Sequence, residues 1–367
     1  MRVGVALKLA VVALSVSSAA LAQTVPQTEP DYPRGRISGY MFGDAYFNVA
    51  GDPIHRYNGD GVDSGLVNIV ADGKKIIGKD LNGVQLRRIY FQADNDLSVK
   101  FSTRFRLEVD GKSLTSDGKI GVNVKGAYLQ AKNVIPRGNF LFGILTVPTF
   151  ETVEEFMQYR ALEKTIADLH SLGSSADLGV EMKGFVDAGH RIGYSAMIGN
   201  GTGQKPEGNR YKKSYCSMQL QPIPELKIEP YFDYEGGYKG TDKATYKLFA
   251  GLELKRVVIG AEVVDRVNHS PSGNQEPFGL SVFARTAPPT AKLAAFARYD
   301  RWQPNRRADN RVDTDLYIVG LDWQVYKDVH VIPNVEAAQY RAQGTAVAPS
   351  HNDTQARVTF YYKFSKP

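Results

Sequence analysis

The chain has 367 residues and a formal net charge of +6, and hydrophobic residues make up 43% of it. After the N-terminal segment, no stretch approaches the roughly 18 consecutive apolar residues of a membrane-spanning helix. The positive charge is not gathered into a basic patch with interleaved aromatic residues, which argues against nucleic acid as a partner. The single cysteine, Cys216, excludes an internal disulfide.

Residues 1–22 have the pattern of a secretory signal peptide. Arg2 and Lys8 supply the positive start, a short apolar run follows at residues 9–16, and Ala-Leu-Ala at 20–22 fits a cleavage signal. An N-terminal core helix is the alternative interpretation. We expect residues 23–367 to be one exported domain.

The segment at residues 97–109 sets the pattern for the rest of the chain. Its odd positions are mostly apolar, as at Phe101 and Phe105, whereas its even positions are polar or charged, as at Arg104 and Arg106. Successive side chains of a strand point to opposite faces, so this strand has one apolar and one wet face. The length suits a tilted strand in a bilayer, although a soluble sheet with one wet face could also use it.

The same alternation recurs and predicts an all-β chain of about sixteen strands, with eighteen as the alternative count. A long Gly/Asp-rich loop after the first strand has a small predicted hairpin near Ile69 and Ile76. The predicted strands, besides 97–109, are 36–48, 83–93, 119–131, 140–147, 177–186, 190–198, 213–221, 226–234, 244–254, 256–267, 278–285, 291–302, 312–325, 329–341 and 353–364.

The connections alternate between tight turns and longer polar loops, which is typical of a transmembrane antiparallel β-barrel of the outer membrane. Charges such as Lys247 and Lys363 share strand faces that should line water, because a charge facing lipid costs ~2–4 kcal/mol near the midplane. Phe360 should then face lipid. Aromatic residues near strand ends are expected at the membrane interfaces: Tyr40, Tyr46, Trp323, Tyr326 and Tyr340.

One helical segment is predicted, between the fifth and sixth strands. Thr152 and Glu155 have the spacing of a capping box. Apolar residues follow at helical spacing from Leu162 to Leu172, and Gly173 is placed to end the helix. This segment forms the third long loop of the predicted barrel.

Five short motifs accompany this loop: Ile-Ser-Gly-Tyr at 37–40, Gly-Val-Gln-Leu-Arg-Arg at 83–88, Tyr-Arg-Ala-Leu-Glu-Lys at 159–164, Ser-Ser-Ala-Asp-Leu-Gly-Val at 174–180 and Gly-Asn-Gly at 199–201. With this loop and these motifs the chain resembles trimeric sixteen-stranded porins, whose third loop folds inward and narrows the pore. It is similar, more narrowly, to the phosphate-selective porin O and P family. The resemblance implies a passive channel and a homotrimer. One departure is the end of the chain, where three further residues follow Phe364, whereas such barrels usually finish on an aromatic residue.

The predicted pore-lining site is a constriction between the loop and the barrel wall. Basic residues on the wall and acidic residues on the loop would create a transverse field that favours polar solutes. The alternative is that these are solvated loop charges and local pairs, such as Lys164 with Asp168. The candidate constriction residues are Lys100, Arg104, Arg106, Lys125, Glu151, Glu154, Glu155, Arg160 and Lys164.

These observations predict an outer-membrane porin that passes small hydrophilic or anionic solutes, with modest anion preference and phosphate among the candidates. Its other partners would be outer-membrane lipids. We expect no catalysis, cofactor or metal, because the six histidines have no metal-ligand spacing and His170 and Ser171 are neighbours that do not face each other on a helix. The alternatives are an outer-membrane barrel enzyme, such as a lipase, and an exported carbohydrate-binding β-protein.

Overall fold

The computed structural model describes residues 31–51, 70–71, 74–75, 79–110, 115, 118–286, 292–348 and 352–366. The chain divides into two units, Met1–Tyr32 and Pro33–Pro367, and the named strands and helices belong to the second. The predicted signal peptide lies outside the described residues.

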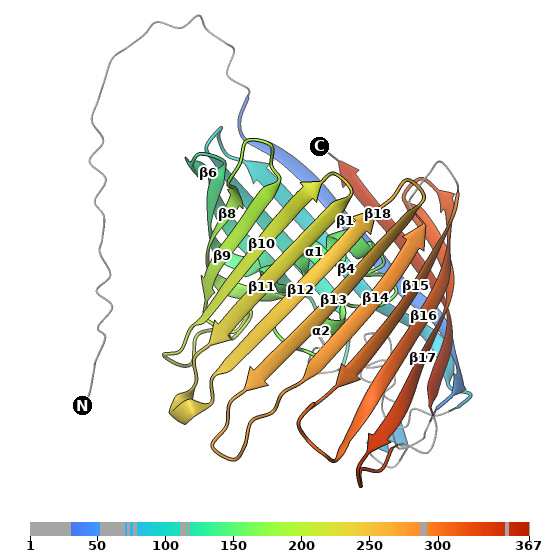
Figure 1. Ribbon diagram of the computed structural model, residues 1–367. Coiled ribbons are helices and arrows are strands. Elements are labelled where there is room, and N and C mark those ends of the chain that lie inside the picture. Colours follow the sequence, from blue (N-terminus) through green and yellow to red (C-terminus); the bar gives the residue numbers. More distant parts are fainter. Residues whose placement is uncertain are drawn as a thin grey trace, which may run out of the picture. The chain divides into compact units, whose positions relative to one another are not determined.

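The strands of the second unit close into an antiparallel barrel in which neighbours in sequence are neighbours in space (Figure 1). The barrel closes where β1 (Arg34–Ala50) pairs with β18 (Asp353–Lys366). The prediction of an all-β barrel with sixteen strands is confirmed. The strands between these two are β4 (Asn82–Asp96), β5 (Phe101–Asp110), β6 (Asn123–Ile135), β7 (Gly138–Thr146), β8 (Ala176–Phe185), β9 (Ile192–Gly199), β10 (Lys213–Ile223), β11 (Leu226–Glu235), β12 (Lys243–Glu253), β13 (Val257–Asn268), β14 (Phe278–Thr286), β15 (Leu293–Gln303), β16 (Arg311–Tyr326) and β17 (Val329–Gln343).

The alternation of connections is also confirmed. We call the end with the tight turns, such as those at 136–137 and 327–328, the turn end, and the opposite end the loop end. The loop end carries a short hairpin of β2 (Val70–Ala71) and β3 (Lys74–Lys75), near the predicted one, and the 3-10 turn η1 (Tyr238–Gly240).

The strand that set the pattern in the sequence begins later than predicted. Residues 97–100, taken as the start of the strand at 97–109, form the turn between β4 and β5. The hydroxyl of Ser98 accepts the amide N–H groups of Lys100 at 3.2 Å and Phe101 at 3.1 Å, and the Leu97 amide donates to the Phe101 carbonyl at 2.9 Å. These bonds close the turn and stop β4 and β5 from pairing further.

The two faces of the strands separate as predicted. Phe101 and Phe105 on β5 keep 44% of their surface exposed, and Phe360 on β18 keeps 50%. Arg357 and Thr359, which alternate with Phe360, are buried inside the barrel. The outward phenylalanines do not pack on a second sheet, which excludes a β-sandwich.

The predicted aromatic belt is wrong for part of its members. Trp323 and Tyr326 lie on the outer face and are well exposed. Tyr40 and Tyr46 share their strand face with buried Asp44 and point into the barrel instead. Tyr340 on β17 also faces the interior, because it shares its strand face with buried Ala338. The period of two residues decides this orientation, since Tyr40, Asp44 and Tyr46 are separated by even numbers of residues.

The connection between β7 and β8, residues 147–175, contains α1 (Pro148–Met157) and α2 (Ile166–Leu169), and we call it the insert. The predicted capping box is wrong, because α1 begins at Pro148 and the hydroxyl of Thr152 donates to Glu229 on β11 at 2.8 Å. Proline suits the first turn, where its missing N–H is not needed. Gln158, at φ 65°, ends α1 and splits the single predicted helix. Among the described residues, no helix is long and apolar enough to cross a bilayer.

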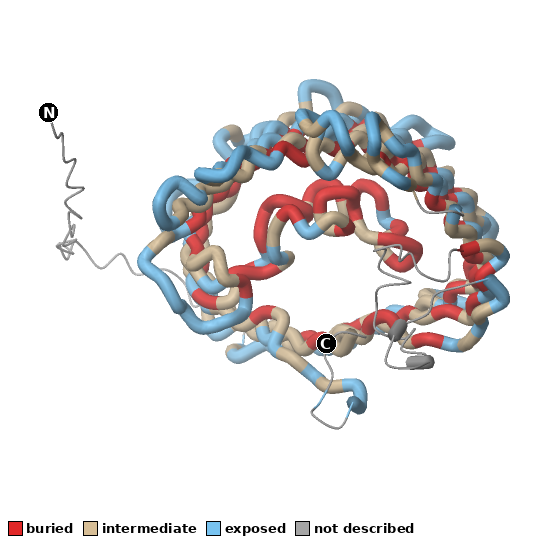
Figure 2. The backbone as a smooth tube through the Cα atoms, turned by 90° about the horizontal axis from the view of Figure 1, so that it is seen from below, coloured by how far each residue is buried: buried red, intermediate tan, exposed pale blue. Residues whose placement is uncertain are grey.

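The insert lies inside the barrel and follows one side of its wall (Figure 2). Phe156 and Leu162 pack in an apolar cluster with side chains of β12 to β17, including Phe283. Gly251 on β12 makes room for this contact, because a Cβ atom there would lie 2.5 Å from the Phe156 ring. The insert therefore packs through apolar side chains against β12 to β17, whose inner face also carries buried charged residues such as Lys247 and Arg298.

Candidate functional site

Basic side chains of the wall hold the insert by its backbone. Lys247 donates to the Thr149 carbonyl at 2.6 Å, and Arg285 donates to the Phe156 carbonyl at 3.1 Å. Arg87, on the other side of the barrel, donates to the Leu162 carbonyl at 2.9 Å. Because the last turn of a helix leaves its carbonyl groups without intrahelical partners, Arg285 satisfies an acceptor at the end of α1 that would otherwise be buried unpaired. Three further arginines, Arg266, Arg298 and Arg357, make bonds of the same kind to Leu172, Lys164 and Leu162.

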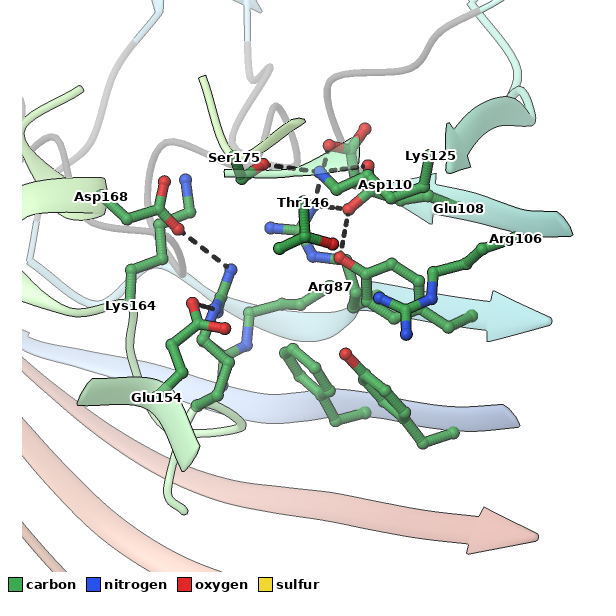
Figure 3. A pocket seen from close by; sticks show the side chains of 15 residues that line it. Arg87, Arg106, Glu108, Asp110, Lys125, Thr146, Glu154, Lys164, Asp168 and Ser175 are labelled. Atoms are coloured by element: carbon green, nitrogen blue, oxygen red, sulfur yellow. Dashed lines mark hydrogen bonds and ion pairs between the residues drawn. The ribbon is translucent and has the colours of Figure 1, made fainter. Parts of the chain in front are cut away.

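A cavity of about 160 Å³ lies between the insert and the wall formed by β1 and β4 to β7 (Figure 3). Charged groups line both of its sides, and Tyr40 and Tyr90 line the wall between them. The charged lining residues are Arg87, Arg88, Arg106, Lys125, Arg160 and Lys164, with the carboxylates Glu108, Asp110, Glu154 and Asp168.

Two β-bulges shape the basic wall of this cavity. On β4, Arg88 pairs with Phe42 and Leu86 with Gly43, so Arg87 has no partner on β1. A bulge interrupts the alternation of side chains, and both Arg87 and Arg88 point into the barrel.

The second bulge lies on β6, where Arg106 of β5 pairs with Gly126 and the next β5 residue pairs with Val124. Lys125 is left unpaired in the ladder and joins the lining of the cavity. The two bulges lie on the two strands that flank β5, so they bring cations to β5 from both sides.

The cations of the wall converge on carboxylates of β5. Arg88 Nη1 lies 2.8 Å from Glu108 Oε1 and 2.9 Å from Asp110 Oδ2. Lys125 Nζ lies 2.9 Å from Glu108 Oε2 and donates to the Ser175 hydroxyl at 2.7 Å. Arg88 and Lys125 are therefore largely neutralised by their neighbours.

Arg106 differs from these cations, because it has no ion pair among the residues that the structure describes. Its Nε donates to the Gln92 side-chain oxygen at 2.7 Å, and its guanidinium lies over the Tyr90 ring, 5.5 Å from the centroid. Neither partner carries a negative charge. Arg106 thus presents a full positive charge to the cavity.

The insert presents acid and base together. Arg160 Nε lies 3.3 Å from Glu154 Oε1, and its Nη2 lies 3.8 Å from Asp168 Oδ2. Burial inside the barrel raises the pKa of Glu154, Arg160 opposes this shift, and Asp168 adds to it. Glu154 therefore holds its proton to a higher pH than an exposed glutamate does.

The structure brings together five of the nine candidate constriction residues: Arg106, Lys125, Glu154, Arg160 and Lys164. Their role in a pore stays a prediction.

The other four candidate residues lie elsewhere. Lys100 is in the turn at residues 97–100, outside the cavity. Arg104 lies nearer the turn end, with its Nε 2.6 Å from Asp94 Oδ1. Glu151 and Glu155 face a second cavity, of about 460 Å³, on the other side of the insert. Glu151 is 3.7 Å from Lys183 there, so the acidic residues of α1 do not act as one group.

Sequence reasoning missed several members of the cavity. Asp110 and Tyr90 carry no signal beyond the strand alternation, and alternation alone lets only one of Arg87 and Arg88 face inward. Tyr40 is four residues from Asp44 on the same strand, so the two side chains lie on one face. The charge of Asp44 was therefore the sign in the sequence that Tyr40 faces the lumen.

The arrangement offers charge and hydrogen bonds to a solute. His170 stacks flat on Trp302, with ring centroids 3.9 Å apart, and burial lowers its pKa to about 3. It is therefore neutral at physiological pH and is engaged by a ring instead of by Ser171. No group of three or more His, Cys, Asp or Glu within the described ranges could hold a metal ion.

In its fold the chain is similar to solved outer-membrane porins. An anion-selective porin from Comamonas acidovorans aligns at 11% identity with a TM-score of 0.63, over 91% of this chain and 100% of that chain. OmpT of Vibrio cholerae aligns at 10% identity with a TM-score of 0.61, over 92% and 99%. OmpF of Salmonella typhi, solved with daunomycin, aligns at 10% identity with a TM-score of 0.61, over 90% and 98%.

The sequence itself matches no protein-family model, and a search of curated proteins gives no match. At identities this low, the structural likeness shows the fold, that of sixteen-stranded outer-membrane porins. The narrower resemblance to the phosphate-selective porin O and P family stays a prediction.

Proposed function

We propose that this protein is a porin of the bacterial outer membrane, a passive channel for small hydrophilic solutes with a modest preference for anions. The observation that carries the proposal is the cavity between insert and wall, where charges from α1 face charges from β4 to β6 inside a closed barrel. Solutes move down their gradients through such a constriction, and its width and lining charge select among them.

The preference for anions follows from the balance of charge. Six cationic and four carboxylate side chains line the cavity, and most of the cations of the wall are paired. The excess of positive charge is small, and Arg106 is the least neutralised of these cations. Strict selection of phosphate would need several unpaired cations around one anion, so we propose phosphate as one permeant anion among others.

Planar-bilayer recording of the mature protein tests this proposal. We expect stepwise conductance that scales with salt concentration, and swelling of proteoliposomes in small sugars but not in large ones. A protein that inserts and gives neither conductance nor swelling would contradict the proposal and would favour a closed barrel with another role.

We further propose a homotrimer, on the strength of the porin fold. A solved structure of Vibrio cholerae OmpT is described as a trimer form, and it aligns with 91% of this chain at 13% identity. Native mass spectrometry in several mild detergents is the test. Trimers in at least one detergent support the proposal, and monomers in all of them contradict it.

A further inference from the structure

A hollow of about 590 Å³ lies at the turn end of the barrel, across the edges of β13 to β16. It is separate from the insert and from the cavity described above. Its lining combines two adjacent cations with apolar and small side chains: Lys255, Arg256, Thr286, Leu293, Ala295 and Leu321.

The floor of the hollow is apolar and faces outward. Leu293 on β15 and Leu321 on β16 keep 57% and 51% of their surface exposed. Ala295 pairs with Leu321 in the strand ladder, and the small side chains of Ala295 and Thr286 create the depression between the leucines. The Thr286 hydroxyl accepts the Ala295 amide N–H at 3.0 Å, which fixes the position of this side chain at the edge of the hollow.

The cations stand at one edge of this floor. Lys255 and Arg256 form the turn between β12 and β13, which the Leu254 amide closes by donating to the Val257 carbonyl at 2.9 Å. Both are exposed, and neither makes an ion pair within the part of the chain that the structure describes. The connection between β14 and β15, residues 287–292, contains no acidic residue that could neutralise them.

We propose that this hollow is a docking site for an anionic phospholipid. The phosphate would lie against Lys255 and Arg256, and an acyl chain would run along Leu293 and Leu321. The complementarity is twofold, because an anionic headgroup matches two unneutralised cations and a hydrocarbon chain matches an outward apolar floor. A free anion would use only the first of these features. The inference rests on the proposed outer-membrane location, since only there does a lipid meet this surface.

Native mass spectrometry of the full mature protein, titrated with phosphatidylglycerol in a mild detergent, tests the site. Each Lys or Arg at a membrane surface contributes about fivefold in affinity for anionic lipid, about 1 kcal/mol. We expect K255Q/R256Q to reduce the retention of the first bound lipid by about 5- to 30-fold. K327Q/K366Q is the matched control, because it removes two exposed cations from the same end of the barrel, and it should retain lipid like the wild type.

A second variant separates a lipid from a simple anion. L293N keeps both cations and weakens the apolar floor, so it should also lower lipid retention. Equal retention in all variants would overturn the inference, and so would full retention in L293N. A change in subunit number that accompanies the loss would assign the hollow to contacts between copies and would also overturn it. Conductance is recorded in parallel. A protein that conducts but binds no lipid at this hollow contradicts the lipid-docking inference and leaves the proposed channel function intact.

Discussion

Arg87 and Arg88 are consecutive residues of β4, and both side chains lie inside the barrel. Arg87 meets Asp44 on β1 and the backbone of the insert, whereas Arg88 meets Glu108 on β5. The bulge that allows this gives one strand two functions. One arginine holds the insert, and the other pairs with carboxylates of the wall opposite it.

Loss of the Arg87 side chain should destabilise the protein strongly. Arg87 Nε lies 2.6 Å from Asp44 Oδ2, and both side chains are fully buried. R87M leaves the Asp44 carboxylate buried without its counter-ion, which costs about 3–5 kcal/mol in the free energy of unfolding. Urea unfolding in lipid vesicles measures this change.

The control for this variant is R36M. Arg36 on β1 also pairs with an aspartate of β4, Asp94, at 3.1 Å, but it is 58% exposed. An exposed pair is worth about 0–1 kcal/mol, so R36M should be nearly neutral. Similar losses for both variants would show that Arg87 does not act through its burial.

The anion preference should depend on pH through Glu154. Because burial raises the pKa of this carboxyl, its negative charge is lost at a higher pH than the ordinary value of about 4.3 as the solution is acidified. Anion preference should therefore increase over that range, as measured by reversal potentials between pH 7 and pH 4.

E154Q should show the higher anion preference at neutral pH and lose this pH dependence. E207Q is the control, because Glu207 lies in the loop between β9 and β10, and its bond from Lys212 lowers its pKa. A pH dependence that persists unchanged in E154Q would assign the titration to another group.

A charged substitution tests the outward orientation of the Phe105 side chain on β5. Phe105 faces away from the lumen, so F105R places a cation against lipid and should cost ~2–4 kcal/mol if the residue lies near the midplane. We expect a smaller folded fraction in vesicles, measured by the change of electrophoretic mobility on heating. S102R, on the inward face of the same strand, should fold like the wild type. Equal folding of both variants would contradict the assigned orientation of β5.

The fold was predictable because apolar and polar residues alternate with a period of two, and this alternation can be recognised within each strand alone. Phe105 and Phe360 reveal the outer face, and the turns reveal the strand ends, without any knowledge of long-range contacts. Residues such as Tyr40 were misplaced where aromatic character was given more weight than this period.

The site was less predictable because it depends on breaks in the pattern. The bulges at Arg87 and Lys125 follow from how two strands pair, and a single strand carries no sign of them. The start of α1 was missed for a similar reason, since Thr152 bonds to Glu229 of a distant strand instead of capping its own helix. Arg104 and Arg106 look equivalent in sequence, and only the structure pairs the first with Asp94.

The central claim is that the charges lining the cavity set the ion preference of the channel. The most direct test compares variants of Arg104 and Arg106 by the reversal potential of single channels in a tenfold gradient of dilute potassium chloride. We expect the wild type to favour chloride. R106Q should lower the ratio of chloride to potassium permeability clearly, because Arg106 is the wall cation without an ion pair among the described residues. R104Q should change the ratio much less, because Arg104 lies outside the cavity and is paired with Asp94, a carboxylate that it shares with Arg36. A wild-type channel that favours potassium, or a ratio that responds to R104Q and not to R106Q, would contradict the account.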